Sequence, residues 1–182
     1  MTAKTLTIYG NEEVKKVFDE CTRREMRQDV AAGIFFVTVR PFEEFGVGSY
    51  RVTAFPAVHT QAEDALLYLV EKDGKGYLHL HDTGKLTEET YGYLEKKKKR
   101  LSLVTLDCTL VDTSSSTSGR HMGLKENEEV MRRLQQIGAA GKETKFVITH
   151  FSHNSAPLTD RLKDVEERYG VVAAYDGMSV EI

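Results

Sequence analysis

Apolar and polar positions follow two different periods along this chain. Runs rich in β-branched and aromatic residues predict strands, and apolar positions three or four residues apart predict helices. The predicted strands are residues 6–9, 34–39, 50–59, 65–70, 76–82, 101–106, 146–149, 171–175 and 178–182. The predicted helices are residues 12–27, the segment from Thr87 to the basic run 96–100, and two segments that end at Gly138 and Gly170. Strands alternating with helices predict an α/β fold with helices packed on sheets.

Local signals define the ends of several predicted elements. Asp73-Gly74 is a strong turn signal and predicts a hairpin between two of the strands. Asn11 and Thr87 predict helix N-caps, because their side chains accept a hydrogen bond from the first helical turn. Pro56 indicates an edge or a bulge near the end of its strand, because proline cannot donate to a sheet. We find no internal repeat or linker, so we expect one domain over residues 1–182.

The composition is that of an ordinary globular protein, with 40% hydrophobic and 29% charged residues. The net charge of -3 argues against a dedicated nucleic-acid binder. We interpret the basic run 96–100 as a solvated helix end rather than a nucleic-acid contact. Cys21 and Cys108 are too few for a disulfide scaffold and predict small core residues in a reducing compartment. With no bilayer-spanning apolar run and no signal segment, we expect a cytoplasmic protein without membrane contact.

Residues that bind metals gather where predicted strands end. His59, Asp82 and His150 each end a strand, His121 lies in a glycine-flanked loop, and His153 follows shortly after. Ends of strands on the same side of a sheet converge, and sites on α/β sheets form there. Each histidine alone is more typical of a loop hydrogen-bonder. Together, imidazoles and a carboxylate are the ligand set of zinc, manganese or iron, so the sequence predicts a metal site.

Two motifs beside Asp82 add to this prediction. In Asp82-Thr83-Gly84, a carboxylate at a strand end precedes a glycine that lets another backbone segment come close. The alternative interpretation is an aspartate that only caps the next turn. His79 and His81 lie on one face of the same strand, either as further ligands or as a pair that faces solvent or a helix.

Five segments together resemble the metallo-β-lactamase superfamily: residues 53–59, 77–84, 119–123, 149–154 and 174–178. Asp-Thr-Gly after one strand and Thr-His-Phe-Ser-His after another are specific in combination. The sequence looks most like the branch of phosphoribosyl cyclic phosphodiesterases and tRNA 3'-processing endonucleases. The resemblance covers nearly the whole chain and implies an αββα sandwich.

The resemblance also implies roles for individual residues. Asp82 would bridge two divalent metal ions, zinc or manganese, while His59 and His150 would each complete the shell of one ion. His121 would act as general acid or bind the scissile phosphate, which makes His121 and Asp82 the catalytic residues. His153 would contact the metal ligands and help to orient them without binding a metal itself.

One motif of the family is missing. Its main ligand motif, H-x-H-x-D-H, does not occur, and His79-Leu80-His81-Asp82 has the wrong spacing to replace it. We therefore expect an N-terminally truncated domain that binds metal weakly or partially and is inactive alone. Uncovered sheet edges would favour aggregation or a homodimer.

The resemblance leaves three functions open. The first is a metal-dependent phosphodiesterase that cleaves a small or cyclic phosphodiester with a hydroxide activated by two metals. The second is a tRNA 3'-processing type of endonuclease that contacts RNA through residues 96–100, which ranks lower because the flexible RNA-grasping arm is missing and the chain is acidic. The third is a degenerate, non-catalytic binding module.

Overall fold

The computed structural model describes residues 5–60, 64–111, 119–153 and 159–182. The strands of this part of the chain are β1 Leu6–Gly10, β2 Ile34–Thr38, β3 Glu44–Val47, β4 Tyr50–Pro56, β5 Leu66–Lys72, β6 Lys75–Leu80, β7 Leu103–Asp107, β8 Lys145–Thr149 and β9 Val172–Ala173. The helices are α1 Glu12–Glu25, α2 Gln28–Ala31, α3 Glu88–Lys96, α4 Leu124–Gln136 and α5 Thr159–Tyr169.

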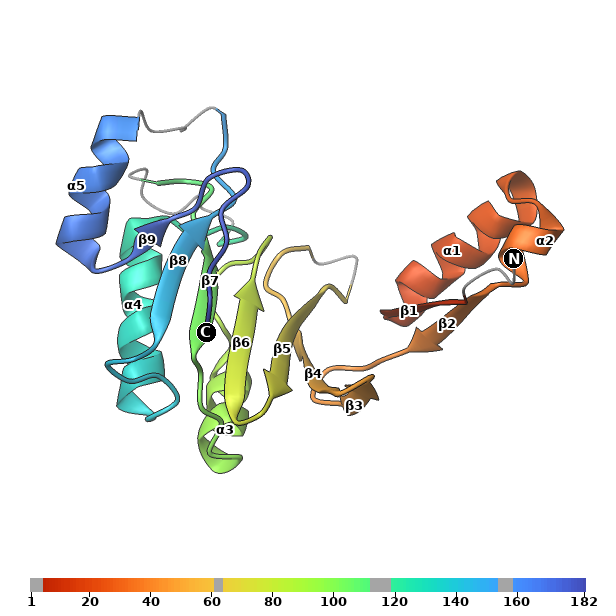
Figure 1. Cartoon of the computed structure of the whole chain (residues 1–182), viewed down its shortest axis with the longest axis horizontal. Coiled ribbons are helices and arrows are strands. Elements are labelled where there is room, and N and C mark those ends of the chain that lie inside the picture. Colours follow the sequence, from red (N-terminus) through yellow and green to blue (C-terminus); the bar gives the residue numbers. More distant parts are fainter. Residues whose placement is uncertain (1–4, 61–63, 112–118, 154–158) are drawn as a thin grey trace.

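Strands β3 to β9 form one seven-stranded sheet in chain order. The pairs from β3 to β6 are antiparallel, and those from β6 to β9 are parallel. The parallel strands therefore end at the same edge of the sheet, toward the top of Figure 1. This edge carries the residues that follow β6, β7 and β8.

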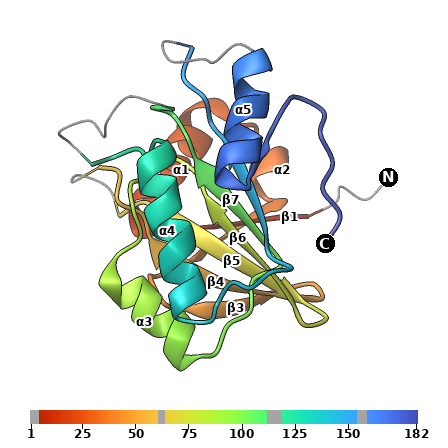
Figure 2. The same ribbon diagram turned by 90° about the vertical axis from the view of Figure 1, so that its left-hand side faces the viewer.

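One face of this sheet forms the core. Side chains alternate along the strands, so that Leu69, Leu78 and Leu106 are fully buried beneath the helices. Helices α3 and α4 contribute Leu94 and Leu134 to the same cluster. Figure 2 shows these helices and α5 in front of the sheet. Each such side chain contributes about 1.5–3 kcal/mol of burial free energy, which makes this face a rigid platform for the strand ends.

The N-terminal unit, which comprises β1, α1, α2 and β2, lies on the other side of the large sheet (Figure 1). Strands β1 and β2 pair in parallel, and α1 begins at Asn11, whose Oδ1 accepts a hydrogen bond from Val14 N at 2.8 Å. Tyr9 stacks on Phe45 of β3 with ring centroids 4.9 Å apart. Figure 1 shows the resulting order of layers, from helices α3–α5 through the large and small sheets to α1. This order confirms the predicted α/β sandwich.

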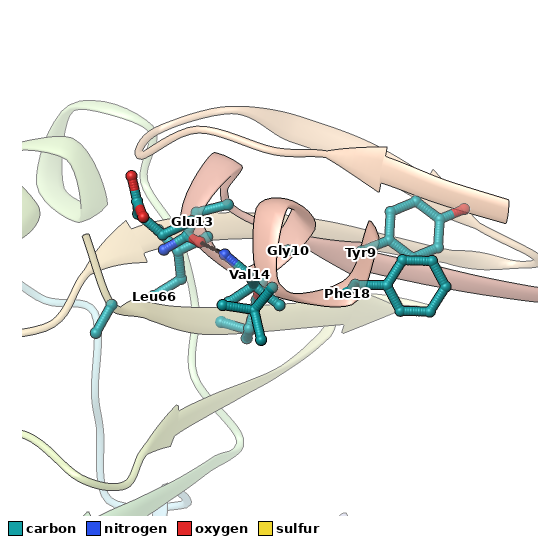
Figure 3. Close-up of a pocket in the computed structure, with 10 residues that line it drawn as sticks. Tyr9, Gly10, Glu13, Val14, Phe18 and Leu66 are labelled. Carbon is teal, nitrogen blue, oxygen red and sulfur yellow. Dashed lines mark hydrogen bonds between the residues drawn. The ribbon is translucent and has the colours of Figure 1, made fainter. Parts of the chain in front are cut away.

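An apolar groove separates the N-terminal unit from strand β5. Figure 3 shows Tyr9, Val14 and Phe18 on one side of this groove and Leu66 on the other. Its volume is about 570 Å³. Val14 is 50% exposed and Val17 is 60% exposed, and no residue of α1 is buried. The N-terminal unit therefore presents apolar surface that the described residues leave uncovered.

Most predicted elements are confirmed, with four corrections. Helix α2 was missed, because its four residues are too few to show a helical period. Residues 178–182, predicted as a strand, form none. Strand β3 was missed, because it is a short, largely exposed edge strand interrupted by Gly46. The helix predicted to reach Arg27 ends at Glu25, where the backbone becomes extended at Met26. The Ser- and Thr-rich segment 112–119 predicts a loop, and its residues 112–118 lie outside the described residues. Among those described, no helix has the length and apolarity needed to cross a membrane.

Candidate metal centre

Three adjacent strands deliver polar side chains to one edge of the sheet. Asp82 follows β6, Asp107 ends β7 and His150 follows β8, while His121 comes from the segment before α4. Each of these four residues offers one ligand atom, and these atoms all lie within 4.8 Å of one another. The parallel topology therefore brings together residues that are up to 68 positions apart in sequence.

Asp82 lies at the centre of the predicted histidines. Its Oδ1 is 3.3 Å from His150 Nε2, 3.9 Å from His59 Nε2 and 4.0 Å from His121 Nδ1. The rings of His59 and His121 also meet edge to face, with centroids 5.0 Å apart. The structure thus brings together all of the predicted ligands and the predicted general acid. His153, in contrast, is exposed in the turn that follows.

Asp107 was not predicted as a site residue, although it is the most enclosed member of the group. It is fully buried, and its Oδ1 accepts hydrogen bonds from Thr109 N at 3.0 Å and Met122 N at 3.3 Å. Its Oδ2 accepts from Thr83 N at 3.3 Å and lies 3.0 Å from His121 Nδ1. The available signal was a carboxylate at the end of a buried strand, the same signal that identified Asp82.

The backbone is strained where two of these residues project. Asp82 has φ 49° and His150 has φ 62°, the left-handed region that costs a non-glycine residue free energy. Such conformations cost roughly 1–3 kcal/mol and cluster at functional sites. His150 directly follows β8 and Asp82 lies two residues after the end of β6, so in both places the left-handed turn lies where the chain leaves the sheet.

Gly84 brings two further site segments together. Gly84 N donates a hydrogen bond to Val58 O at 2.8 Å, next to His59. A Cβ added at Gly84 would lie only 1.8 Å from Gly119 O, two residues before His121. The prediction that this glycine allows a close backbone approach is therefore confirmed, and the approach positions both histidines.

The H-x-H pair lies in a polar network on the face of the sheet opposite to helices α3 and α4. His79 Nδ1 is 2.6 Å from Tyr77 Oη and 3.1 Å from Thr105 Oγ1, and its ring lies 4.1 Å from that of His81. Burial, with further contributions from His79 and His150, lowers the pKa of His81 to about 4. His81 is therefore neutral at pH 7 and extends the imidazole cluster, its ring centroid 5.8 Å from that of His150.

Two nitrogens of the cluster are buried without a hydrogen-bond partner among the described residues. These are His59 Nδ1 and His81 Nε2. A buried, unpaired imidazole nitrogen is costly unless another group satisfies it. The nitrogens that face Asp82 Oδ1 are His59 Nε2 and His150 Nε2. A divalent cation suits this position, because neutral imidazole and carboxylate oxygen are the donors that zinc and manganese bind. The residues present therefore fit a metal centre.

A family model described as the beta-lactamase superfamily domain matches residues 1–172. The chain belongs to the beta-lactamase superfamily. Within this superfamily, the fold and the strand-end cluster agree with the resemblance drawn from the sequence. No curated protein matches the chain.

Several solved structures share the fold at low sequence identity. The chain is similar to the metallo-beta-lactamase fold protein YhfI from Bacillus subtilis, with 18% identity, a TM-score of 0.68, and coverage of 97% of this chain and 65% of that one. Zn²⁺-bound PqqB from Methylobacterium extorquens has 20% identity, a TM-score of 0.68, and coverage of 98% and 63%. Unliganded yeast PDE1 has 16% identity, a TM-score of 0.65, and coverage of 97% and 60%. The chain thus spans less than two thirds of each of these three proteins.

Proposed function

We propose that the strand-end cluster is the active centre of a metal-dependent phosphodiesterase that acts on a small or cyclic phosphodiester. The observation that carries this proposal is the convergence of Asp82, Asp107, His121 and His150 within 4.8 Å. The choice of a phosphodiester rests on the resemblance to the phosphoribosyl cyclic phosphodiesterase branch. The structural neighbours support the fold alone.

Asp82, His150 and His59 would hold the metal ions. Divalent ions in such a site supply an activated water and neutralise charge that develops on the reacting phosphate. Asp82 suits the shared position, because its Oδ1 faces both histidines at 3.3 and 3.9 Å. Thr109 Oγ1 lies 2.8 Å from His150 Nδ1, which orients the His150 ring with Nε2 toward Asp82.

His121 is arranged to give a proton to the leaving oxygen. Its Nδ1–H donates to the buried carboxylate of Asp107 at 3.0 Å, which sets the tautomer and orientation of the ring. As general acid the ring would be the doubly protonated imidazolium, which transfers its Nε2 proton and keeps Nδ1–H on Asp107. A positioned acid of this kind contributes roughly 10²–10⁴-fold to the rate.

The test separates metal binding from catalysis. The purified chain is stripped with a chelator and reloaded with Zn²⁺ or Mn²⁺. Bound metal is measured by elemental analysis, and turnover of bis-p-nitrophenyl phosphate and of a 2',3'-cyclic nucleotide is followed. We expect Asp82→Ala to lose the metal that the chain binds together with any turnover it supports, and His121→Ala to keep its metal while any kcat falls. Asp164→Ala, an exposed change on α5, is the matched control.

Three results would count against the proposal. If the chain bound no metal, the centre would not be a metal site; metal binding without turnover would instead agree with the expectation that a chain without the H-x-H-x-D-H ligands is inactive alone. If Asp82→Ala retained full metal content, the shared-ligand role would be wrong. If His121→Ala lost as much metal as Asp82→Ala, His121 would be a ligand rather than the proton donor.

A further inference from the structure

A basic pocket lies at the end of the large sheet opposite to the metal centre. It is lined by the β3–β4 turn, the β5–β6 turn around Asp73-Gly74, and Lys97–Arg100 after α3, and its volume is about 540 Å³. Figure 1 shows the end of α3 and the start of β6 at this lower end of the sheet. Strand β6 has six residues, so the pocket and the centre are roughly 20 Å apart.

The pocket is strongly cationic in a chain whose net charge is -3. Seven of its lining residues are lysine or arginine, and two are acidic. The basic run contributes four of these cations, and the remaining three come from the strands: Arg51, Lys72 and Lys75. The fold therefore places this charge run in a positively charged hollow, although the sequence favoured a solvated helix end over a nucleic-acid contact.

Only some of these cations are neutralised by the protein. Lys99 is 8% exposed, and its Nζ donates to Glu71 Oε2 at 2.6 Å and to Glu44 Oε2 at 3.1 Å. Arg51 Nε lies 3.7 and 3.8 Å from the same two carboxylates. These contacts occupy both glutamates, which leaves the other lysines of the pocket without an ion pair to a side chain among the described residues.

An exposed aromatic ring borders the unpaired charges. Tyr50 lines the pocket and is 46% exposed, and Lys72 Nζ lies over its ring, 5.1 Å from the centroid. A base that stacks on Tyr50 would take the place of this lysine, whose charge would then be available to a phosphate. A site for phosphate alone needs cations but no exposed aromatic ring. Cations that follow a phosphate backbone, together with an aromatic ring on which a base can stack, are the combination used to bind single strands.

We propose that this pocket binds single-stranded nucleic acid, with phosphates on Lys72, Lys97 and Lys98 and a base stacked on Tyr50. The site is separate from the metal centre and does not depend on the proposed hydrolysis. Each lysine that neutralises a phosphate releases counterions, so the affinity falls as salt rises. The stacked base contributes affinity that salt does not affect.

The test measures binding of a fluorescein-labelled 12-nucleotide oligouridylate by anisotropy, with a chelator present so that metal chemistry is excluded. The double variant Lys97→Glu/Lys98→Glu should bind at least tenfold more weakly, and the slope of log K against log salt should become shallower by about 1.4. Tyr50→Ala should bind about tenfold more weakly with an unchanged slope. Lys16→Glu/Lys163→Glu changes the net charge equally at exposed sites on α1 and α5 and should keep its affinity within twofold.

Circular dichroism melting checks that every variant is folded before binding is compared. The proposal is overturned if the control weakens binding as much as the pocket variant, because binding then follows net charge alone. It is also overturned if inorganic polyphosphate of equal charge competes as well as the oligonucleotide and Tyr50→Ala has no effect. That result would identify a general polyanion site without base stacking.

Discussion

Replacing Gly84 by alanine should damage the metal centre through the backbone. The added Cβ would lie 1.8 Å from Gly119 O, 3.0 Å from Gly119 C and 3.4 Å from Val58 O. A carbon and an oxygen need roughly 3.4 Å or more, so the two segments must separate by about 1.5 Å. Because Gly119 O, Gly119 C and Val58 O are all backbone atoms, no side-chain rotation relieves the clash. The segment that carries His121 must therefore move.

The cost follows from the contacts that are lost. Overpacking of this kind costs about 1–3 kcal/mol. Displacing Gly84 also removes its 2.8 Å hydrogen bond to Val58 O, worth about 0.5–1.5 kcal/mol. We expect Gly84→Ala to lower the free energy of unfolding by about 2–4 kcal/mol, measured by urea denaturation of the metal-free chain. We further expect at least a tenfold loss of Zn²⁺ affinity in the fraction that remains folded.

Two other glycines provide matched controls. Gly76→Ala would place its Cβ 2.4 Å from Arg100 O, a comparable clash far from the centre, so it should lower stability but leave Zn²⁺ affinity unchanged. Gly92 lies in α3 with nothing within 4 Å of an added Cβ, and alanine there should stabilise by about 0.5–1 kcal/mol. If Gly84→Ala matched the wild type in both stability and Zn²⁺ affinity, the positioning role of the close approach would be refuted.

Three further changes test separate features. Asp107→Asn replaces one acceptor oxygen by a donor facing backbone N–H groups, so the free energy of unfolding should fall by about 1.5–3 kcal/mol and kcat should fall as His121 loses its orientation. Cys108 is buried as predicted, whereas Cys21, predicted as a core residue, is exposed. Burial raises the pKa of Cys108 to about 12, so a thiol reagent should modify only Cys21 until urea unfolds the chain. The pKa of His81 is about 4 when folded and 6.5 when unfolded, so the unfolded chain binds more protons between these values. The free energy of unfolding of the metal-free chain should therefore fall as pH drops from 6.5 to 4. His81→Gln should reduce this dependence on pH, and an equal dependence in both proteins would contradict the prediction.

The sequence predicted the fold well where local signals and packing agree. The turn at Asp73-Gly74 joins β5 and β6 as expected, and Thr87 caps α3 by accepting from Thr90 N at 3.2 Å. Pro56 ends β4 beyond the last residue that pairs with β3, so it sits at a local edge despite lying in an interior strand. The extended C-terminal segment was over-predicted, because an apolar alternation cannot show whether a neighbouring strand is there to pair with it.

The candidate site was predictable as a set of strand ends but not in its buried part. His59, Asp82 and His150 stand out because each follows an apolar run and none suits a core. Asp107 follows a similar run, yet nothing local separates a ligand or positioning carboxylate from a turn cap. Its role depends on backbone N–H groups from the residues after β6 and before α4, which only the parallel order of strands brings to it.

Residues of the basic run 96–100 have different roles, because their neighbours in the folded chain differ. Five consecutive cations at a helix end have the same local chemistry, and dipole arguments treat them alike. Lys99 differs because its side chain turns under the sheet to Glu44 and Glu71, where removing it would leave partly buried carboxylates without their cation. Lys97 and Lys98 remain exposed beside Tyr50 in the same hollow. A loss of stability should therefore follow substitution of Lys99, and a loss of ligand binding should follow substitution of its two neighbours. That contrast is the property that distinguishes a built binding surface from a merely solvated helix end.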